Sequence, residues 1–117
     1  MPISTHILDT ALGRPAAGVP VSLSRLEAGH WLHLGQAVTN ADGRCPHLLP
    51  QSPEVASSDL TAGLYRIRFE TNAYYESLAT EGLYPYIEIA FYVLPGQLHY
   101  HIPLLLTAHS YTTYRGS

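Results

Sequence analysis

Apolar and polar residues alternate along several short stretches of this 117-residue chain, and a period of two is typical of strands with one buried face. The pattern runs through residues 19–26, 64–70 and 87–93. Two further strands are predicted near the ends of the chain, in residues 4–9 and 99–106. The residues of the first three strands predicted to share a buried face are Val19, Val21, Leu23, Tyr65, Ile67, Phe69, Ile87, Ile89, Phe91 and Val93.

Turn-forming residues separate these strands. Glycine, proline or an Asp-Gly pair, which tight reversals require, occur in residues 12–18, 40–44 and 94–97. Residues 46–61 are predicted to form a long loop, because proline, serine and other polar residues interrupt any regular pattern there. Short strands separated by such turns favour a β-sandwich.

One segment has helical spacing. In residues 71–80, Leu78 follows Tyr74 and Tyr75 by four and three positions, which places all three on one face of a helix. Thr71 or Asn72 is the candidate N-cap. The predicted fold class is therefore mainly β, a sandwich with one short α-helix, in a single domain over residues 1–117.

The composition indicates self-association rather than binding of nucleic acid. The chain is 46% hydrophobic and only 13% charged, so a small domain has apolar surface left to cover. Its formal net charge is −3, and its six basic residues are all arginines that form no run. A nucleic-acid-binding protein would present a basic patch.

Neither disulfides nor membrane segments are predicted. Cys45 is the only cysteine, so an intramolecular disulfide and a cysteine-cluster metal site are excluded. The start MPISTHILD has no basic stretch followed by a long apolar run, so we expect no signal peptide and a cytoplasmic protein. No apolar run approaches the ~20 residues of a membrane span.

Two histidines, His6 and His101, lie in the predicted strands near opposite ends of the chain. In residues 99–106, the strand face that carries His101 also carries a proline and a leucine. Such a face should not point at water, so we expect it to be an oligomer interface. For the other strand, alternation groups His6 with Leu8 but leaves open which face points inward. In residues 99–106, alternation sets a core face of Ile102, Leu104 and Leu106 against His99, His101, Pro103 and Leu105.

Residue chemistry alone gives these positions ordinary structural roles. A strand histidine is more often a hydrogen-bonded or surface residue than a catalyst. Arg44 follows a tight turn, where an arginine is normally solvated. His99 and His101 have the spacing of metal ligands, but no Asp, Glu or Cys stands near enough to complete a site, so no metal is predicted. Asp9 is expected to cap the turn that follows it.

Four segments in order along the whole chain resemble the transthyretin-related 5-hydroxyisourate hydrolases of urate degradation. They are STHILDTALGRPAAGVPVSL, TNADGR, HYHIPLLL and YTTYRGS. The terminal Tyr-Arg-Gly-Ser is the most specific of these signals. The chain departs from the family at Thr107, Ala108 and His109, where a Ser-Pro-Tyr run is common.

The resemblance implies two four-stranded sheets with one short helix. It also implies a homotetramer, a dimer of dimers, with sites in a channel at the dimer–dimer interface. The implied reaction, in purine degradation, is hydrolysis of 5-hydroxyisourate to 2-oxo-4-hydroxy-4-carboxy-5-ureidoimidazoline, by histidine-assisted water attack on a ring amide carbonyl. Neither a metal nor an organic cofactor is implied.

The same resemblance implies which residues act. Histidine, with an unperturbed pKa near 6.5, suits proton transfer at neutral pH. A guanidinium offers a charged planar fork for carbonyl groups and a developing oxyanion. The implied catalytic residues are His6, Arg44, His101 and Ser117, and the implied substrate-binding residues are Tyr114, Arg115 and Gly116.

Two other functions fit the sequence. One is a non-catalytic, transthyretin-like carrier of a small ligand, whose channel would favour small apolar residues at the position of His101 and would not need the terminal Tyr-Arg-Gly-Ser. The other is a structural module that binds a protein partner through the face of Pro103 and Leu105. The second predicts a monomer or heteromer, which distinguishes it from the tetramer.

Overall fold

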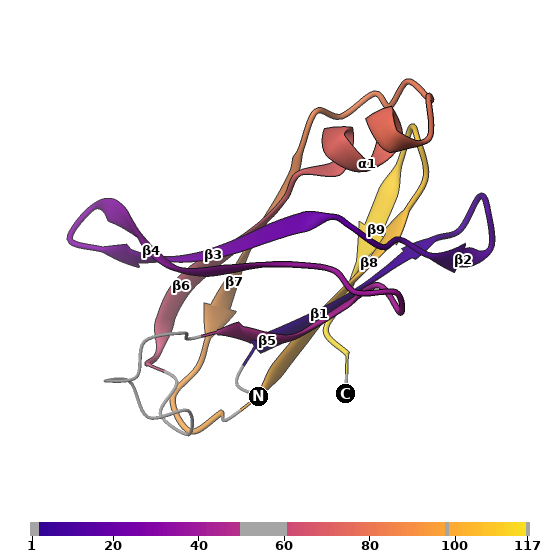
Figure 1. Cartoon of the computed structure of the whole chain (residues 1–117). Coiled ribbons are helices and arrows are strands. Elements are labelled where there is room, and N and C mark those ends of the chain that lie inside the picture. The colour runs from indigo at the N-terminus through magenta and orange to yellow at the C-terminus, as the bar shows by residue number, and fades with distance from the viewer. Residues whose placement is uncertain (1–2, 50–60, 98, 117) are drawn as a thin grey trace.

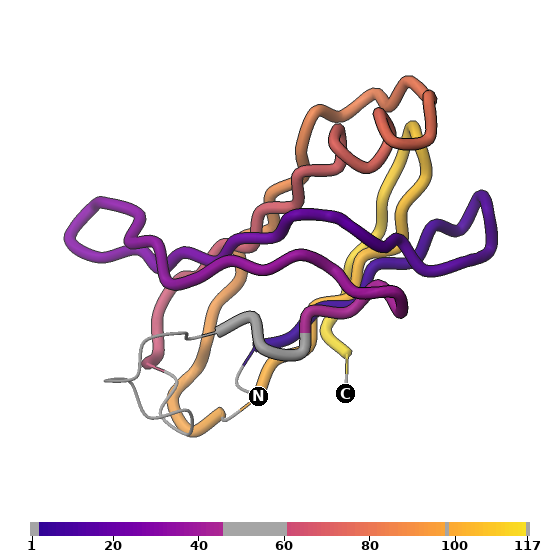
Figure 2. The backbone as a smooth tube through the Cα atoms, viewed as in Figure 1, coloured from indigo at the N-terminus to yellow at the C-terminus, as the bar shows by residue number. Residues whose placement is uncertain are grey.

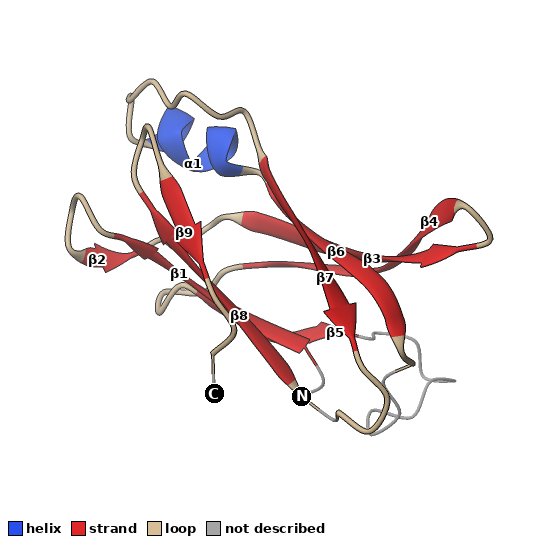
Figure 3. Cartoon of the chain, turned by 180° about the vertical axis from the view of Figure 1, so that it is seen from behind, coloured by secondary structure: helices blue, strands red, loops and turns tan. Residues whose placement is uncertain are grey.

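The computed structural model describes residues 3–49, 61–97 and 99–116, with the side chains of residues 46–49 left out (Figure 1). The fold is mainly β, as predicted, and its one helix covers an end of the two sheets (Figures 1 and 3). The elements are β1 (Ile3–Asp9), β2 (Arg14–Pro15), β3 (Pro20–Glu27), β4 (His30–Val38), β5 (Arg44–Leu49), β6 (Gly63–Phe69), α1 (Thr71–Ser77), β7 (Ile87–Val93), β8 (Tyr100–Leu106) and β9 (Tyr111–Thr113).

The first sheet is built around β1. One edge of β1 pairs in parallel with β8, which pairs in turn with β9. The other edge pairs with β5 along the first half of β1 and with β2 along its last two residues. The prediction of four strands is therefore corrected to five, although β5 and β2 share one edge and the sheet stays four strands wide.

The second sheet has the order β4-β3-β6-β7 and is antiparallel throughout. The residues predicted to face inward do so: most are almost completely buried, and Ile89 and Phe91 pack against them partly buried. In the first sheet, Ile3, Ile7 and Leu104 have no exposed surface. The face of β1 that carries His6 therefore points outward, which the sequence had left open.

The helix differs from its prediction in length and in its cap. It ends at Ser77, because Ala79 adopts a left-handed φ of 51° and the Thr80 amide returns to the Tyr75 carbonyl. Neither candidate cap is correct. Glu70 is the N-cap residue without a side-chain cap hydrogen bond, while the Thr71 hydroxyl donates to the Tyr84 carbonyl. Within the described ranges, no helix is long and apolar enough to cross a membrane.

The predicted loop at 46–61 is wrong at its start, because residues 46–49 continue β5 along β1. Residues 50–60 lie outside the described part of the chain. Pairing with β1 supplies the hydrogen bonds that a surface loop would have found in water. This longer β5 extends the pairing from His6 and Arg44 to Ile3 and Leu49.

Asp9 caps the turn after β1, as predicted. Its Oδ1 accepts hydrogen bonds from the amides of Ala11 and Leu12, at 3.1 and 3.0 Å. Its Oδ2 accepts a third, 2.7 Å long, from the Tyr74 hydroxyl of α1. Burial, followed by this bond to Asp9, raises the pKa of Tyr74 to about 12. A buried carboxylate thus ties the helix to the first sheet.

Candidate functional site

His6, Arg44 and His101 lie on one face of the first sheet, although they come from three strands. His6 in β1 pairs with Arg44 in β5, and Ser4, two residues earlier, pairs with His101 in β8. Paired residues project to the same face of a sheet. The residues on either side of each histidine along its own strand are buried in the core. Both histidines therefore project outward, away from the second sheet.

A tight turn holds Arg44 in this place. Asn40 closes it, because its Oδ1 accepts a hydrogen bond from the Arg44 amide at 3.1 Å. Gly43 has a φ of +72°, and a Cβ there would collide with the Ile7 carbonyl oxygen. The Gly43 carbonyl in turn accepts the Ile7 amide at 2.8 Å. The Asp-Gly signal of the sequence therefore fixes the start of β5 against β1, opposite His6.

The C-terminal segment runs back beside β8 after β9 (Figure 2). The Gly116 amide donates to the His101 carbonyl at 2.8 Å, and the two residues form an isolated bridge. A Cβ on Gly116 would lie 2.5 Å from Cδ2 of the imidazole. Real Cβ atoms do not approach so closely, so only glycine lets the segment cover the ring of His101 in this position.

The surroundings of His101 disfavour its protonated form. Burial lowers the pKa of His101, and electrostatic interactions with Arg44, His6 and His99 lower it further. A hydrogen bond with the Ser4 backbone offsets part of this effect. These surroundings favour the neutral imidazole, which is the form that can accept a proton.

Arg115, which precedes Gly116, is not held beside the ring of His101. The Arg115 guanidinium lies 4.4 Å from the centre of the Tyr100 ring and donates to Gln97 Oε1 at 2.9 Å. Tyr100 and His101 point to opposite faces of β8, so Arg115 lies on the other side of the sheet. Tyr114 is 55% exposed, and Ser117 lies outside the described residues.

A sequence model of the HIUase/Transthyretin family matches residues 3–116 of this chain. The chain belongs to that family. A 5-hydroxyisourate hydrolase of Mus musculus is 45% identical over 118 residues, covering 99% of this chain and 95% of that protein.

Two solved structures share the fold over nearly the full length. The 5-hydroxyisourate hydrolase of Klebsiella pneumoniae is 37% identical, with a TM-score of 0.81 and complete coverage, 100%, of both chains. Sea bream transthyretin in complex with thyroxine is 32% identical, with a TM-score of 0.87 over 99% of this chain and 95% of that one. The resemblance found in the sequence is thereby confirmed at the level of family and fold.

The departure from the family sequence at residues 107–109 lies away from His6 and His101. These residues form the turn between β8 and β9, closed by a bond of 2.9 Å from the Thr107 amide to the Ser110 carbonyl. The Leu83 amide, in the connection after α1, donates to the Ala108 carbonyl. Figures 1 and 3 show this hairpin tip beside the helix, at the opposite end of β8 from His101.

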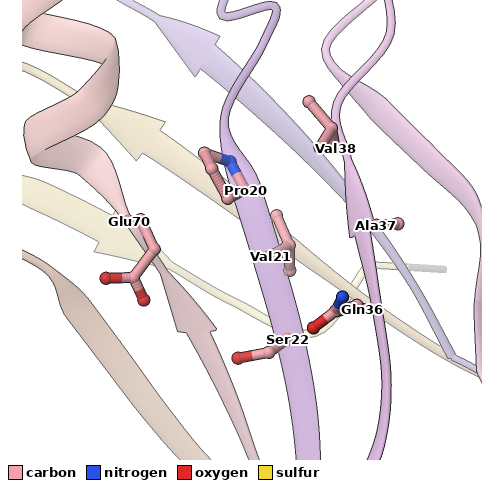
Figure 4. A pocket seen from close by; sticks show the side chains of 7 residues that line it. All are labelled: Pro20, Val21, Ser22, Gln36, Ala37, Val38 and Glu70. Atoms are coloured by element: carbon pink, nitrogen blue, oxygen red, sulfur yellow. The ribbon is translucent and has the colours of Figure 1, made fainter.

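Two cavities elsewhere in the protein lack the groups that activate water. A cavity of about 410 Å³ lies along β3 and β4, and its one carboxylate, from Glu70, is bound by Arg68 at 2.6 Å (Figure 4). A second, of about 280 Å³, lies between β7 and β8 and includes Arg115. No imidazole lines either one, so the open face around His101 is the better candidate.

No metal centre forms within the described residues, where no three His, Cys, Asp or Glu side chains come close enough to hold an ion. Cys45 lies in the core beside Arg44 and is 1% exposed. Burial raises the pKa of its thiol to about 11, so the nucleophilic thiolate is not populated at neutral pH. Cys45 therefore contributes packing rather than chemistry.

The positive charge of Arg44 leads to a prediction about the titration of His101. Replacing Arg44 by alanine removes a positive charge beside His101, so the pKa of His101 should rise and its protonation should begin at higher pH. Following the His101 ring protons by NMR against pH measures this shift. The control is Arg14→Ala, because Arg14 is an exposed arginine at the far end of β1. A His101 titration that is the same in Arg44→Ala and wild type would contradict the assigned arrangement.

Proposed function

We propose that this chain hydrolyses 5-hydroxyisourate at its N1–C6 amide and produces 2-oxo-4-hydroxy-4-carboxy-5-ureidoimidazoline. The observation that carries the proposal is the convergence of two imidazoles and a guanidinium on one outward face, built from β1, β5 and β8. Relatives that match almost the whole chain are named for this hydrolysis. The reaction requires a proton acceptor and a positive group, and this face offers both.

Water attacks the C6 carbonyl in the proposed reaction. One histidine, His6 or His101, takes a proton from the water as its oxygen bonds to carbon. Arg44 stabilises the negative charge that develops on the carbonyl oxygen. The C6–N1 bond then breaks as N1 receives the proton from the histidine, and C6 becomes a carboxylic acid, which loses its proton to solvent. The lowered pKa of His101 supports a role as acceptor, because its imidazole is neutral before the attack.

The C-terminal residues have supporting roles in this scheme. Gly116 covers the His101 ring without displacing it. Arg115 holds the segment to the body of the protein through Tyr100 and Gln97. We propose that Ser117 orients the attacking water or a histidine and that Tyr114 forms part of the substrate pocket. These last two roles are carried over from the family resemblance.

The proposed assembly is a homotetramer, a dimer of dimers, with its sites where the dimers meet. In an isolated protomer, His6 and His101 are only partly buried, on the side away from the second sheet. Leu105 shares this face and is only partly buried in the protomer. A facing subunit would exclude water there and strengthen the interactions of charged groups with substrate. Size-exclusion chromatography with light scattering would reject the assembly if it found a monomer at micromolar concentration.

Steady-state kinetics of wild type and Arg44→Ala test the proposed function. Urate oxidase generates 5-hydroxyisourate in situ, and its loss is followed by ultraviolet absorbance. Removing a group that stabilises an oxyanion typically lowers kcat by about 10²–10³-fold, so Arg44→Ala should show a loss of this size. Arg14→Ala should keep the wild-type rate. Equal rates in Arg44→Ala and wild type would remove Arg44 from the mechanism.

The likeness to sea bream transthyretin in complex with thyroxine favours one other candidate, a carrier of a small aromatic ligand. A carrier requires no proton acceptor, so an array of His6, Arg44 and His101 is not expected for that function. Thyroxine binding measured by calorimetry would distinguish the two. Binding by a protein that leaves the lifetime of 5-hydroxyisourate unchanged would favour the carrier.

A further inference from the structure

The side chain of Ser4 lies against the imidazole of His101. Its Oγ is 2.8 Å from Nδ1, the distance of a good hydrogen bond. The two residues are 97 positions apart in the chain but are directly paired in the parallel register of β1 and β8. Both side chains are partly buried on the outward face. The central pairing of the sheet therefore fixes this contact.

We infer that Ser4 is a positioning residue, which accepts a hydrogen bond from Nδ1–H of His101 and leaves the lone pair on Nε2 for the substrate side. The inference rests on the proposed function. A serine hydroxyl can donate or accept, so the 2.8 Å contact alone allows either ring tautomer. In the proposed reaction the proton acceptor of His101 is Nε2, because Ser4 Oγ occupies Nδ1. The one proton of the neutral ring is then on Nδ1, and the Ser4 hydroxyl accepts it in a hydrogen bond.

An uncharged hydrogen-bonding residue, Ser4, is compatible with the electrostatic surroundings of the His101 ring. Within the described residues, the titratable side chains that interact electrostatically with His101 are Arg44 on β5, His6 on β1 and His99 just before β8. Gly116 covers the ring from the C-terminal segment and brings no charge. A carboxylate at the position of Ser4 would stabilise the imidazolium and hold a proton on the ring before the reaction. A hydroxyl fixes the orientation of the ring and leaves it neutral.

Substitution of Ser4 separates positioning from simple structural support. Ser4→Ala should lower kcat about tenfold, the scale of one neutral hydrogen bond, with little change in KM. Ser4→Thr keeps the hydroxyl and should restore most of the rate. Ser24→Ala is the matched control, because Ser24 is a partly buried strand serine of the other sheet. The coupled assay with 5-hydroxyisourate provides all four rates.

The ring tautomer is a readout that does not need activity. In wild type, the ¹⁵N signals of His101 should show Nδ1 protonated and Nε2 unprotonated above the ring pKa. In Ser4→Ala these signals should move toward a mixture of tautomers, and in Ser24→Ala they should not. An unchanged tautomer in Ser4→Ala overturns the inference, even if the rate falls. If wild type does not hydrolyse 5-hydroxyisourate, the proposed function fails, while the tautomer signals still decide whether Ser4 orients the ring.

Discussion

Replacing His101 by asparagine should lower kcat for 5-hydroxyisourate by about 10²–10⁴-fold, the usual contribution of a positioned acid–base group. Asparagine retains hydrogen bonding at this point of β8 but cannot take a proton from water. The strand should remain intact, because its contacts to the core are made by the buried residues on either side, Tyr100 and Ile102. Steady-state kinetics in the coupled assay measures the loss.

His109→Asn is the matched control for this variant. His109 is an exposed histidine in the turn between β8 and β9, at the other end of the strand from His101. It should keep the wild-type rate. Circular dichroism and size-exclusion chromatography should show both variants folded and assembled like wild type. A folded His101→Asn protein with wild-type kcat would show that the outward face of β8 does not carry the chemistry.

Gly116→Ala should lower kcat about 10²-fold, since a displacement of about 1 Å at a reacting group costs this much. The added Cβ would lie 2.5 Å from Cδ2 of His101 and 3.2 Å from its Cγ. Either the imidazole rotates away or the C-terminal segment leaves β8. The loss of rate should come with changed NMR signals of the His101 ring, while the thermal unfolding midpoint stays close to that of wild type.

A double variant shows whether the effect of Gly116 acts through His101. In a His101→Asn background, Gly116→Ala should cost much less than in wild type, because the ring that it displaces is already gone. Strong coupling of this kind is expected for residues in contact. If the two losses multiply independently, the glycine is needed for some other reason, such as the placement of Ser117.

The sequence predicted the inward faces of the strands well, because alternation is a direct consequence of burying one side of a sheet. It failed for β4, where a register shift between Leu23 and Ser24 inserts an extra residue, Leu34, into the pairing. Trp31 and Leu32 then break the alternation, since both are exposed. The cap of α1 depended on the Tyr84 carbonyl, which only the folded chain brings to Thr71.

The candidate site was predicted less completely than the fold. The family resemblance pointed to His6, Arg44 and His101, to which residue chemistry alone gave ordinary structural roles. Neither indicated Ser4. Its role follows from the parallel pairing of β1 with β8, and no local pattern specifies which strands pair at a separation of 97 residues. Likewise, nothing in Tyr-Arg-Gly-Ser shows that Arg115 and Gly116 face opposite sides of β8.

The lifetime of 5-hydroxyisourate in the presence of wild-type protein tests the central claim most directly. With urate exhausted by urate oxidase, the absorbance of the intermediate decays at its spontaneous rate in buffer alone. We predict a decay that is faster in proportion to the concentration of added protein and that returns to the spontaneous rate with His101→Asn. A folded wild-type protein that leaves the decay at the spontaneous rate at every concentration would contradict the proposed hydrolase.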